Sequence, residues 1–152
     1  MILTLARPDR RNALSEAMMR ELDAALRAAG RARGVRAVIL AAEAPGFGSA
    51  HDWNELHAGG EEDRQRIFAV CPELMETIHA LPRPVIAEVR GLATAAGCQL
   101  AAACDLAVAG EEAGFATPGV KIGLFCTTPM VEVARAIGPK RAFEMLVTGR
   151  VV

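Results

Sequence analysis

The chain has 152 residues, of which 52% are hydrophobic and 23% charged, with 17 basic against 18 acidic residues and a net charge of −1. This composition is typical of a folded domain and excludes a disordered chain, and the balanced charge gives no long-range attraction for nucleic acid. Polar residues interrupt every apolar stretch before the roughly 20 residues that a membrane span needs.

The first half of the chain alternates strand and helix patterns, and Ser15 and Asp52 are the predicted N-caps of its first two helices. A long amphipathic helix follows the polar connector 59–63, and its apolar stripe is expected to be core, namely Ile67, Phe68, Cys71, Leu74, Met75 and Ile78. In chain order we predict a strand at 2–5, a helix from 15 to about 29, a strand at 35–40, a loop at 43–50, a helical turn at 52–56 and a long helix that includes 67–78.

The second half continues the alternation with shorter elements. We predict a strand at 85–89, a helix at 95–104, a strand at 106–109, a very short strand at 115–116, and helices near 129–136 and 140–147. Alternation at this spacing indicates an α/β fold with mainly parallel strands. The chain begins within a strand pattern and ends after an apolar helix, so we expect residues 1–152 to be one core domain truncated at both ends.

The N-terminal segment and the cysteines indicate the cellular compartment of the protein. The apolar start is followed by basic residues from Arg7, which reverses the charge order of a secretory signal and predicts a cytoplasmic protein. The cysteines lie in apolar contexts without CxxC spacing, so we expect buried reduced thiols and no metal site at Cys71, Cys98, Cys104 and Cys126.

Two turns are the best candidates for a functional site. Residues 91–100 place small side chains at the start of a predicted helix, directly after a strand, and residues 47–56 repeat the arrangement after another strand. Main-chain N–H groups at such turns lack helical partners and can converge on one oxygen. Converging N–H groups of this kind would make an oxyanion hole, for which loop position alone is a weak signal. No GxGxxG motif follows a strand to favour a nucleotide-binding Rossmann domain.

With these turns and the motifs around them, the chain resembles the crotonase superfamily of enoyl-CoA hydratases and isomerases. The matching motifs are Arg7-Pro8, Asn12-Ala13-Leu14, Phe47 with Asp52 and Glu55-Leu56, Arg83-Pro84-Val85-Ile86-Ala87, Gly91 with Gly97-Cys98 and Leu100, Cys104-Asp105, Phe115-Ala116-Thr117-Pro118 with Gly123, and Thr148-Gly149. They stand in the order and spacing of the family and cover nearly the whole chain.

The resemblance implies a spiral of ββα units that binds an acyl-CoA thioester as a homotrimer or hexamer. Coenzyme A would be part of the substrate, with no further cofactor and no metal. The resemblance also implies that the main-chain N–H groups of His51 and Ala96 polarise the thioester carbonyl and stabilise an enolate. The imidazole of His51 either reaches the same site or is a structural histidine.

Two positions depart from the family pattern. The glutamates that activate water in hydratases fall on Gln99 and Gly119, which cannot serve as general acid or base. Ordinary hydratase turnover is therefore not expected. Isomerase activity is not expected either, because isomerases of the family also need a carboxylate at the position of Gly119. The remaining candidates for proton transfer are Asp52, Glu55, Asp105, Glu112 and Cys126. We favour a helix cap for Asp52, a structural hydrogen bond for Asp105 and a packing role for Cys126. Glu55 and Glu112 are expected to be surface charges.

The resemblance also suggests contacts for coenzyme A and the acyl group. Arg10 and Arg11 either pair with phosphate or belong to a solvated turn. The other residues implied in binding are Gly48, Ser49 and Ala50 at the adenine, Trp53 packed beneath that loop or against the acyl chain, and Phe125 and Cys126 at the acyl pocket. Two hypotheses remain: an enzyme that processes acyl-CoA or enoyl-CoA, and a catalytically weak protein that binds or regulates through the CoA thioester.

Overall fold

A computed structural model describes residues 1–152, and its strands form two parallel sheets. The four-stranded sheet has the order β1 (Ile2–Leu5), β2 (Val38–Ala42), β4 (Val85–Val89) and β6 (Leu106–Ala109). The three-stranded sheet has the order β3 (Gly46–Gly48), β5 (Leu92–Thr94) and β7 (Gly114–Ala116).

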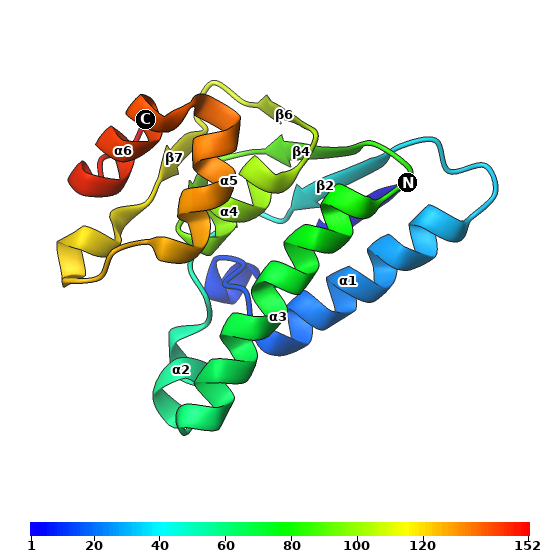
Figure 1. Cartoon of the computed structure of the whole chain (residues 1–152). Coiled ribbons are helices and arrows are strands. Elements are labelled where there is room, and N and C mark those ends of the chain that lie inside the picture. The colour runs from blue at the N-terminus through cyan, green and yellow to red at the C-terminus, as the bar shows by residue number, and fades with distance from the viewer.

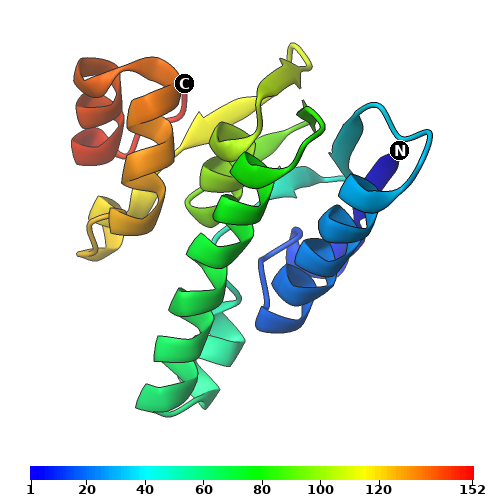
Figure 2. The same ribbon diagram turned by 45° about the vertical axis from the view of Figure 1, so that its right-hand side comes forward.

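Six α-helices and two 3-10 helices connect and cover these strands. They are η1 (Pro8–Arg10), α1 (Glu16–Arg31), α2 (Trp53–Ala58), α3 (Glu61–Ala80), α4 (Ala96–Ala103), η2 (Pro118–Ile122), α5 (Thr127–Ile137) and α6 (Pro139–Thr148). Figures 1 and 2 show α3 between α1 on one side and the pair α5 and α6 on the other. No helix combines the length and the apolar character that crossing a membrane would need.

The chain repeats one unit of two strands followed by helix. In each unit the first strand joins the four-stranded sheet and the second joins the three-stranded sheet, as in β2–β3, β4–β5 and β6–β7. The helices that follow are α2 with α3, then α4, then α5 after η2. This arrangement confirms the predicted α/β class and the crotonase-like spiral of ββα units.

The main core lies where α1 and α3 pack on the four-stranded sheet. Leu40, Val85 and Ala87 of the sheet meet Met19 and Leu74 of the two helices in one fully buried cluster. The predicted N-cap of α1 is confirmed, because Oγ of Ser15 accepts the N–H of Met18 at 3.2 Å. The cap and the amphipathic face together fix α1 against the sheet.

Several predictions about local structure were wrong. The loop at 43–50 contains β3, and the glycine turn after β4 contains β5, because three-residue strands are too short for an alternating pattern. The connector 59–63 already belongs to α3 from Glu61 onward. Phe68 is 43% exposed rather than core, because its ring lines a surface pocket with residues of α2. All four thiols are free, but Cys104 and Cys126 are only partly buried.

Candidate functional site

Two turns, one after β3 and one at the start of α4, are held together by their main chains. The N–H of Gly97 donates to the carbonyl oxygen of Ser49 at 2.8 Å. The turns approach so closely that a Cβ on Gly97 would lie 2.1 Å from the carbonyl oxygen of Gly48. Position 97 therefore requires glycine, and the contact fixes residues 48–52 against the first turn of α4.

The main-chain N–H of His51 has no hydrogen-bond partner, because the bridge between His51 and Leu14 does not use it. His51 forms an isolated parallel bridge with Leu14, in which Leu14 donates its N–H to Ala50 at 3.0 Å and Asp52 donates its N–H to Leu14 at 3.1 Å. A parallel bridge of this kind uses the groups of the two flanking residues. The N–H of His51 consequently points away from Leu14, and no other turn or loop hydrogen bond of the backbone uses it.

The main-chain N–H of Ala96 is free for a different reason. Ala96 is the first residue of α4, and the first N–H groups of a helix have no acceptor within it. Ala95, directly before it, donates its N–H to Ala116 at 2.9 Å and has φ 48° and ψ −116°, which is strained for a residue with a side chain. The hydrogen bond from Gly97 to Ser49 thus joins the two turns that carry the unused N–H groups of His51 and Ala96.

A pocket of about 400 Å³ opens beside these turns, between α2 and α3 on one side and the segment from η2 to α5 on the other. Its wall is mainly apolar, with Leu56, Phe68 and Leu124 among the lining residues, and it contains no aspartate or glutamate. The predicted site residues that the pocket brings together are Ala50, His51, Trp53, Gly119, Phe125 and Cys126. Trp53 is 44% exposed, so it forms the rim of the pocket and is not packed beneath the loop as predicted.

Comparison with known proteins agrees with this architecture. The profile of the family Enoyl-CoA hydratase/isomerase matches residues 1–152. The chain belongs to this family.

The relatives of the chain include curated and structurally solved members of the enoyl-CoA hydratase/isomerase family. The rat mitochondrial enoyl-CoA hydratase domain-containing protein 3 is 46% identical over 97% of this chain, and the Escherichia coli 2,3-dehydroadipyl-CoA hydratase is 32% identical over 98%. The chain spans 49% and 58% of these two proteins, so about half the length of the curated relatives it matches.

Two solved structures resemble the chain closely. The crystal structure of an enoyl-CoA hydratase from Mycobacterium smegmatis has a TM-score of 0.92 and 50% identity, and that of human enoyl-CoA hydratase domain-containing protein 3 has a TM-score of 0.94 and 45% identity. Each comparison covers 99% of this chain and 60% of the solved chain. The family fold is therefore retained along the whole of this chain.

Gln99, at the first glutamate position implied by the resemblance, lies outside the pocket wall. Its side chain is 4% exposed on α4, and Oε1 accepts a hydrogen bond from the thiol of Cys71 on α3 at 3.5 Å. Burial raises the pKa of Cys71 to about 12, with the contact to Gln99 opposing the shift, so the thiol stays protonated and can donate. Gln99 thus joins α3 to α4 in this structure.

Gly119, at the second glutamate position, lines the pocket but has no room for a side chain. A Cβ there would lie 2.7 Å from the carbonyl oxygen of Leu124 and 2.8 Å from Sγ of Cys126. The N–H of Gly119 donates to that sulfur at 3.3 Å. Burial raises the pKa of the Cys126 thiol, and the hydrogen bond from Gly119 opposes the shift only in part. A protonated, half-buried thiol that fills this space fits the packing role predicted for Cys126.

Of the residues predicted for the CoA end, Ala50 lines the pocket, and Arg10, Arg11, Gly48 and Ser49 lie outside its wall. Arg10 and Arg11 are exposed on and after η1, and Nε of Arg10 lies 3.6 Å from a carboxylate oxygen of Asp9. Gly48 and Ser49 support the junction with α4 through the contacts described above. Their predicted roles at phosphate and adenine stay predictions.

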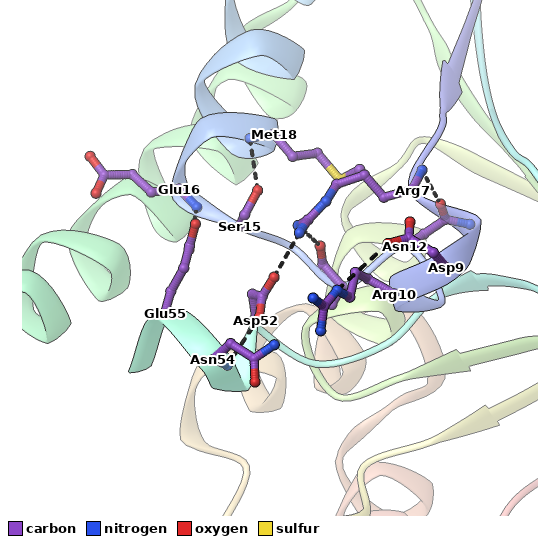
Figure 3. Close-up of polar contacts among 11 residues, drawn as sticks. Arg7, Asp9, Arg10, Asn12, Ser15, Glu16, Met18, Asp52, Asn54 and Glu55 are labelled. Atoms are coloured by element: carbon purple, nitrogen blue, oxygen red, sulfur yellow. Dashed lines mark hydrogen bonds and ion pairs between the residues drawn. The ribbon is translucent and has the colours of Figure 1, made fainter. Parts of the chain in front are cut away.

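A polar network next to η1 includes Arg7, which belongs to a family motif but had no predicted role (Figure 3). Arg7 donates from one guanidinium nitrogen to the carbonyl oxygen of Ala13 at 3.0 Å and from the other to Oδ2 of Asp52 at 2.8 Å. Asp52 caps α2 as predicted, since Oδ1 accepts the N–H of Asn54 at 3.0 Å. Burial alone would raise the pKa of Asp52, but hydrogen bonds from Arg7 and Asn54 lower it. Asp52 is thus a charged structural anchor beside His51.

The other acidic candidates for proton transfer also lie outside the pocket wall. Oδ2 of Asp105 accepts the N–H of Val85 at 2.7 Å, which is the structural role predicted for it. Glu55 is only partly exposed and accepts the N–H of Glu16 at the start of α1 at 2.9 Å, so it is not the free surface charge predicted. Glu112 is exposed, as predicted.

The side chain of His51 is buried and makes no hydrogen bond. It is 7% exposed, and neither Nδ1 nor Nε2 makes a hydrogen bond of acceptable geometry. The ring of Phe68 stands against it edge to face, with centroids 5.2 Å apart. Burial lowers the pKa of His51 to about 4, an effect that the nearby carbonyl of Leu14 offsets only in part. The imidazole is therefore neutral in the folded protein at neutral pH.

This burial predicts a pH dependence of stability. In the unfolded chain the imidazole of His51 regains its ordinary pKa of 6.5, so between pH 7 and 5 the unfolded state binds a proton that the folded state does not. We expect the free energy of unfolding to fall by about 2 kcal/mol over that range, measured by urea denaturation. The variant His51→Gln should lose little stability between pH 7 and 5, whereas His57→Gln, at an exposed position of α2, should lose as much as the wild-type chain. Equal losses in both variants would contradict the assignment.

Proposed function

We propose that the pocket beside His51 and Ala96 holds the acyl group of an acyl-CoA or enoyl-CoA thioester. The thioester carbonyl would lie against the two main-chain N–H groups, which act as an oxyanion hole. The observation that carries the proposal is that both N–H groups lack an acceptor within the chain and belong to turns joined by one hydrogen bond. Each donor aimed at a developing negative charge in a site without water is worth roughly 3–4 kcal/mol.

The apolar wall of the pocket supports this proposal. Leu56, Phe68 and Phe125 offer an acyl chain a surface on which it leaves water, and the oxyanion-hole donors need a site from which water is excluded. The names of the relatives, among them a 2,3-dehydroadipyl-CoA hydratase, also point to CoA thioesters. Arg10 and Arg11, with the loop Gly48, Ser49 and Ala50, remain our proposal for the CoA end.

The acid–base chemistry of the proposed site differs from that of a hydratase with two glutamates. No carboxylate lines the pocket, the Gln99 amide accepts a hydrogen bond from Cys71, and position 119 has no space for a side chain. The oxyanion hole would still polarise the carbonyl and stabilise an enolate, but proton transfer would lack its usual groups. Loss of general acid–base help costs about 10² to 10⁴ in rate.

The alternative function, a catalytically weak protein that binds or regulates through CoA thioesters, is favoured by Gln99 and Gly119. In that case the thioester would bind and be polarised without turnover. For either function we propose a homotrimer or hexamer, which sedimentation velocity can test. The cytoplasmic location stays a prediction, and the rat relative named above is mitochondrial by name.

A carbonyl-polarisation experiment tests the proposed site directly. We expect butyryl-CoA to bind in a calorimetric titration, and the infrared stretch of its ¹³C-labelled thioester carbonyl to move to lower frequency on binding. Hydration of crotonyl-CoA should be about 10² to 10⁴ slower than in a relative that has both glutamates. Butyryl-CoA that does not bind, or that binds with an unshifted carbonyl, would contradict the proposal. Fast hydration that Gln99→Leu abolishes would reject the alternative of a weak binder.

A further inference from the structure

The imidazole of His51 is the one polar side chain on the pocket wall whose atoms are buried and unpaired. Both ring nitrogens are inaccessible to solvent and make no hydrogen bond, although the main-chain carbonyl of Leu14 lies near the ring. The only other such atom in the chain is the hydroxyl oxygen of Thr117, which is not part of the pocket wall. Buried polar groups of native proteins are nearly always paired, so two unpaired nitrogens on one ring call for a ligand.

The surroundings of the ring restrict which ligand that is. Lys121 is the only charged residue among those that line the pocket, and no carboxylate faces the imidazole from the pocket wall. The ring is neutral, since burial lowers its pKa to about 4. A neutral imidazole offers one donor and one acceptor, and a hydroxyl group can match either of them.

Phe68 packs against this group. Its ring stands at 86° to the imidazole, both residues line the pocket, and Phe68 is itself 43% exposed. An exposed side chain on α3 can change its rotamer without moving the backbone, and a ligand would reach the imidazole after such a change. Exposed side chains make such changes within nanoseconds.

We propose that the His51 imidazole is a specificity group that hydrogen-bonds a hydroxyl carried by the acyl group of the thioester. This inference rests on the proposed function, because the main-chain N–H of the same residue is one of the two donors to the thioester oxygen. A substituent that meets the imidazole must therefore lie within a few bonds of the carbonyl, as a 3-hydroxyl does. A site with polar atoms that need a partner discriminates against the ligand that lacks it.

The test compares two thioesters that differ by this hydroxyl. 3-Hydroxybutyryl-CoA and butyryl-CoA are titrated calorimetrically into the wild-type chain, and the hydroxy ligand is recovered and checked for dehydration. We expect the wild-type chain to bind the hydroxy ligand about tenfold more tightly. His51→Leu should bring the two affinities within about twofold, and His51→Asn, which keeps a donor and an acceptor, should restore part of the preference. His57→Gln is the matched control and should keep the tenfold ratio.

A second measurement does not depend on the folding of any variant. In the wild-type chain, the imidazole ¹H–¹⁵N signals of His51 should shift on addition of 3-hydroxybutyryl-CoA and stay nearly unchanged with butyryl-CoA. If butyryl-CoA and its hydroxy analogue bind equally well and shift these signals equally, the inference is overturned. The proposed function would still stand. If neither thioester binds, the proposed function itself fails.

Discussion

Gly97→Ala is expected to unfold the chain or to destabilise it by at least about 4 kcal/mol. The new methyl group would meet the main chain of Gly48, with its carbonyl oxygen at 2.1 Å and its carbonyl carbon at 2.3 Å. Backbone atoms cannot turn aside as a flexible side chain does, so β3 and α4 must separate. Separation also breaks the hydrogen bond from Gly97 to Ser49 and opens the main core at its edge.

The measurement is the free energy of unfolding from urea denaturation, with circular dichroism as the readout. The matched control is Gly60→Ala, because a Cβ on Gly60 would meet nothing within 4 Å and its φ is −75°. The control should cost at most about 1 kcal/mol, since Gly60 is only the N-cap of α3. Equal, small effects at both positions would show that the two turns do not pack as described. A soluble Gly97→Ala protein should also lose affinity for butyryl-CoA.

Asn12→Ala is expected to destabilise the chain by about 4 kcal/mol. Asn12 is fully buried, its Oδ1 accepts the N–H of Arg7, and its Nδ2 donates to the carbonyl oxygens of Glu43 and Gly46, each at 2.8 Å. These bonds hold the turn before α1 against the segment that leads into β3 (Figure 3 shows the Arg7 end). Alanine would leave three main-chain groups unpaired, each at a cost of about 1–3 kcal/mol less what water recovers.

The backbone at Asn12 adds a separate contribution. Its φ is 52°, in the left-handed region that asparagine tolerates and alanine does not, which costs about 1 kcal/mol. Asn12→Gly removes the same side-chain bonds without that cost, so it should be about 1 kcal/mol more stable than Asn12→Ala. Asn54→Ala, at an exposed position in α2, is the control and should change stability by less than about 0.5 kcal/mol. A loss below 1 kcal/mol for Asn12→Ala would contradict the bonding described.

The elements that could be predicted are those with a strong local pattern. The helix α1 has a capping serine and a continuous apolar stripe, and β4 is a mainly β-branched run that ends shortly before Gly91. The short strands β3 and β5 could not be found, because each has three residues and consists of glycine and small or mixed side chains. Their strand conformation depends on pairing with each other, Gly46 with Leu92 and Gly48 with Ala93, which only the folded chain brings about.

The candidate site divides in the same way. Motif order indicated the turns of His51 and Ala96, because glycines and small residues that follow strands can be recognised in the sequence. The sequence could not indicate that the Gln99 amide contacts Cys71, since that contact depends on the packing of α3 against α4. It also could not separate Phe68 from the core stripe of α3, because its helical spacing suits both the core and the pocket wall. The contact of Arg7 could not be predicted, because its partner, Asp52, is 45 positions away.

The two donors proposed for the thioester are peptide groups, which every amino acid except proline possesses. A saturation library at positions 51 and 96 should therefore keep carbonyl polarisation for many small replacements, and only proline should eliminate it outright. Inactivating changes should instead concentrate at the neighbouring glycines, where any side chain forces the two peptides apart. Substitutions that abolish carbonyl polarisation are consequently expected beside the two donor positions, whereas substitutions at position 51 itself should change ligand preference and leave polarisation in place.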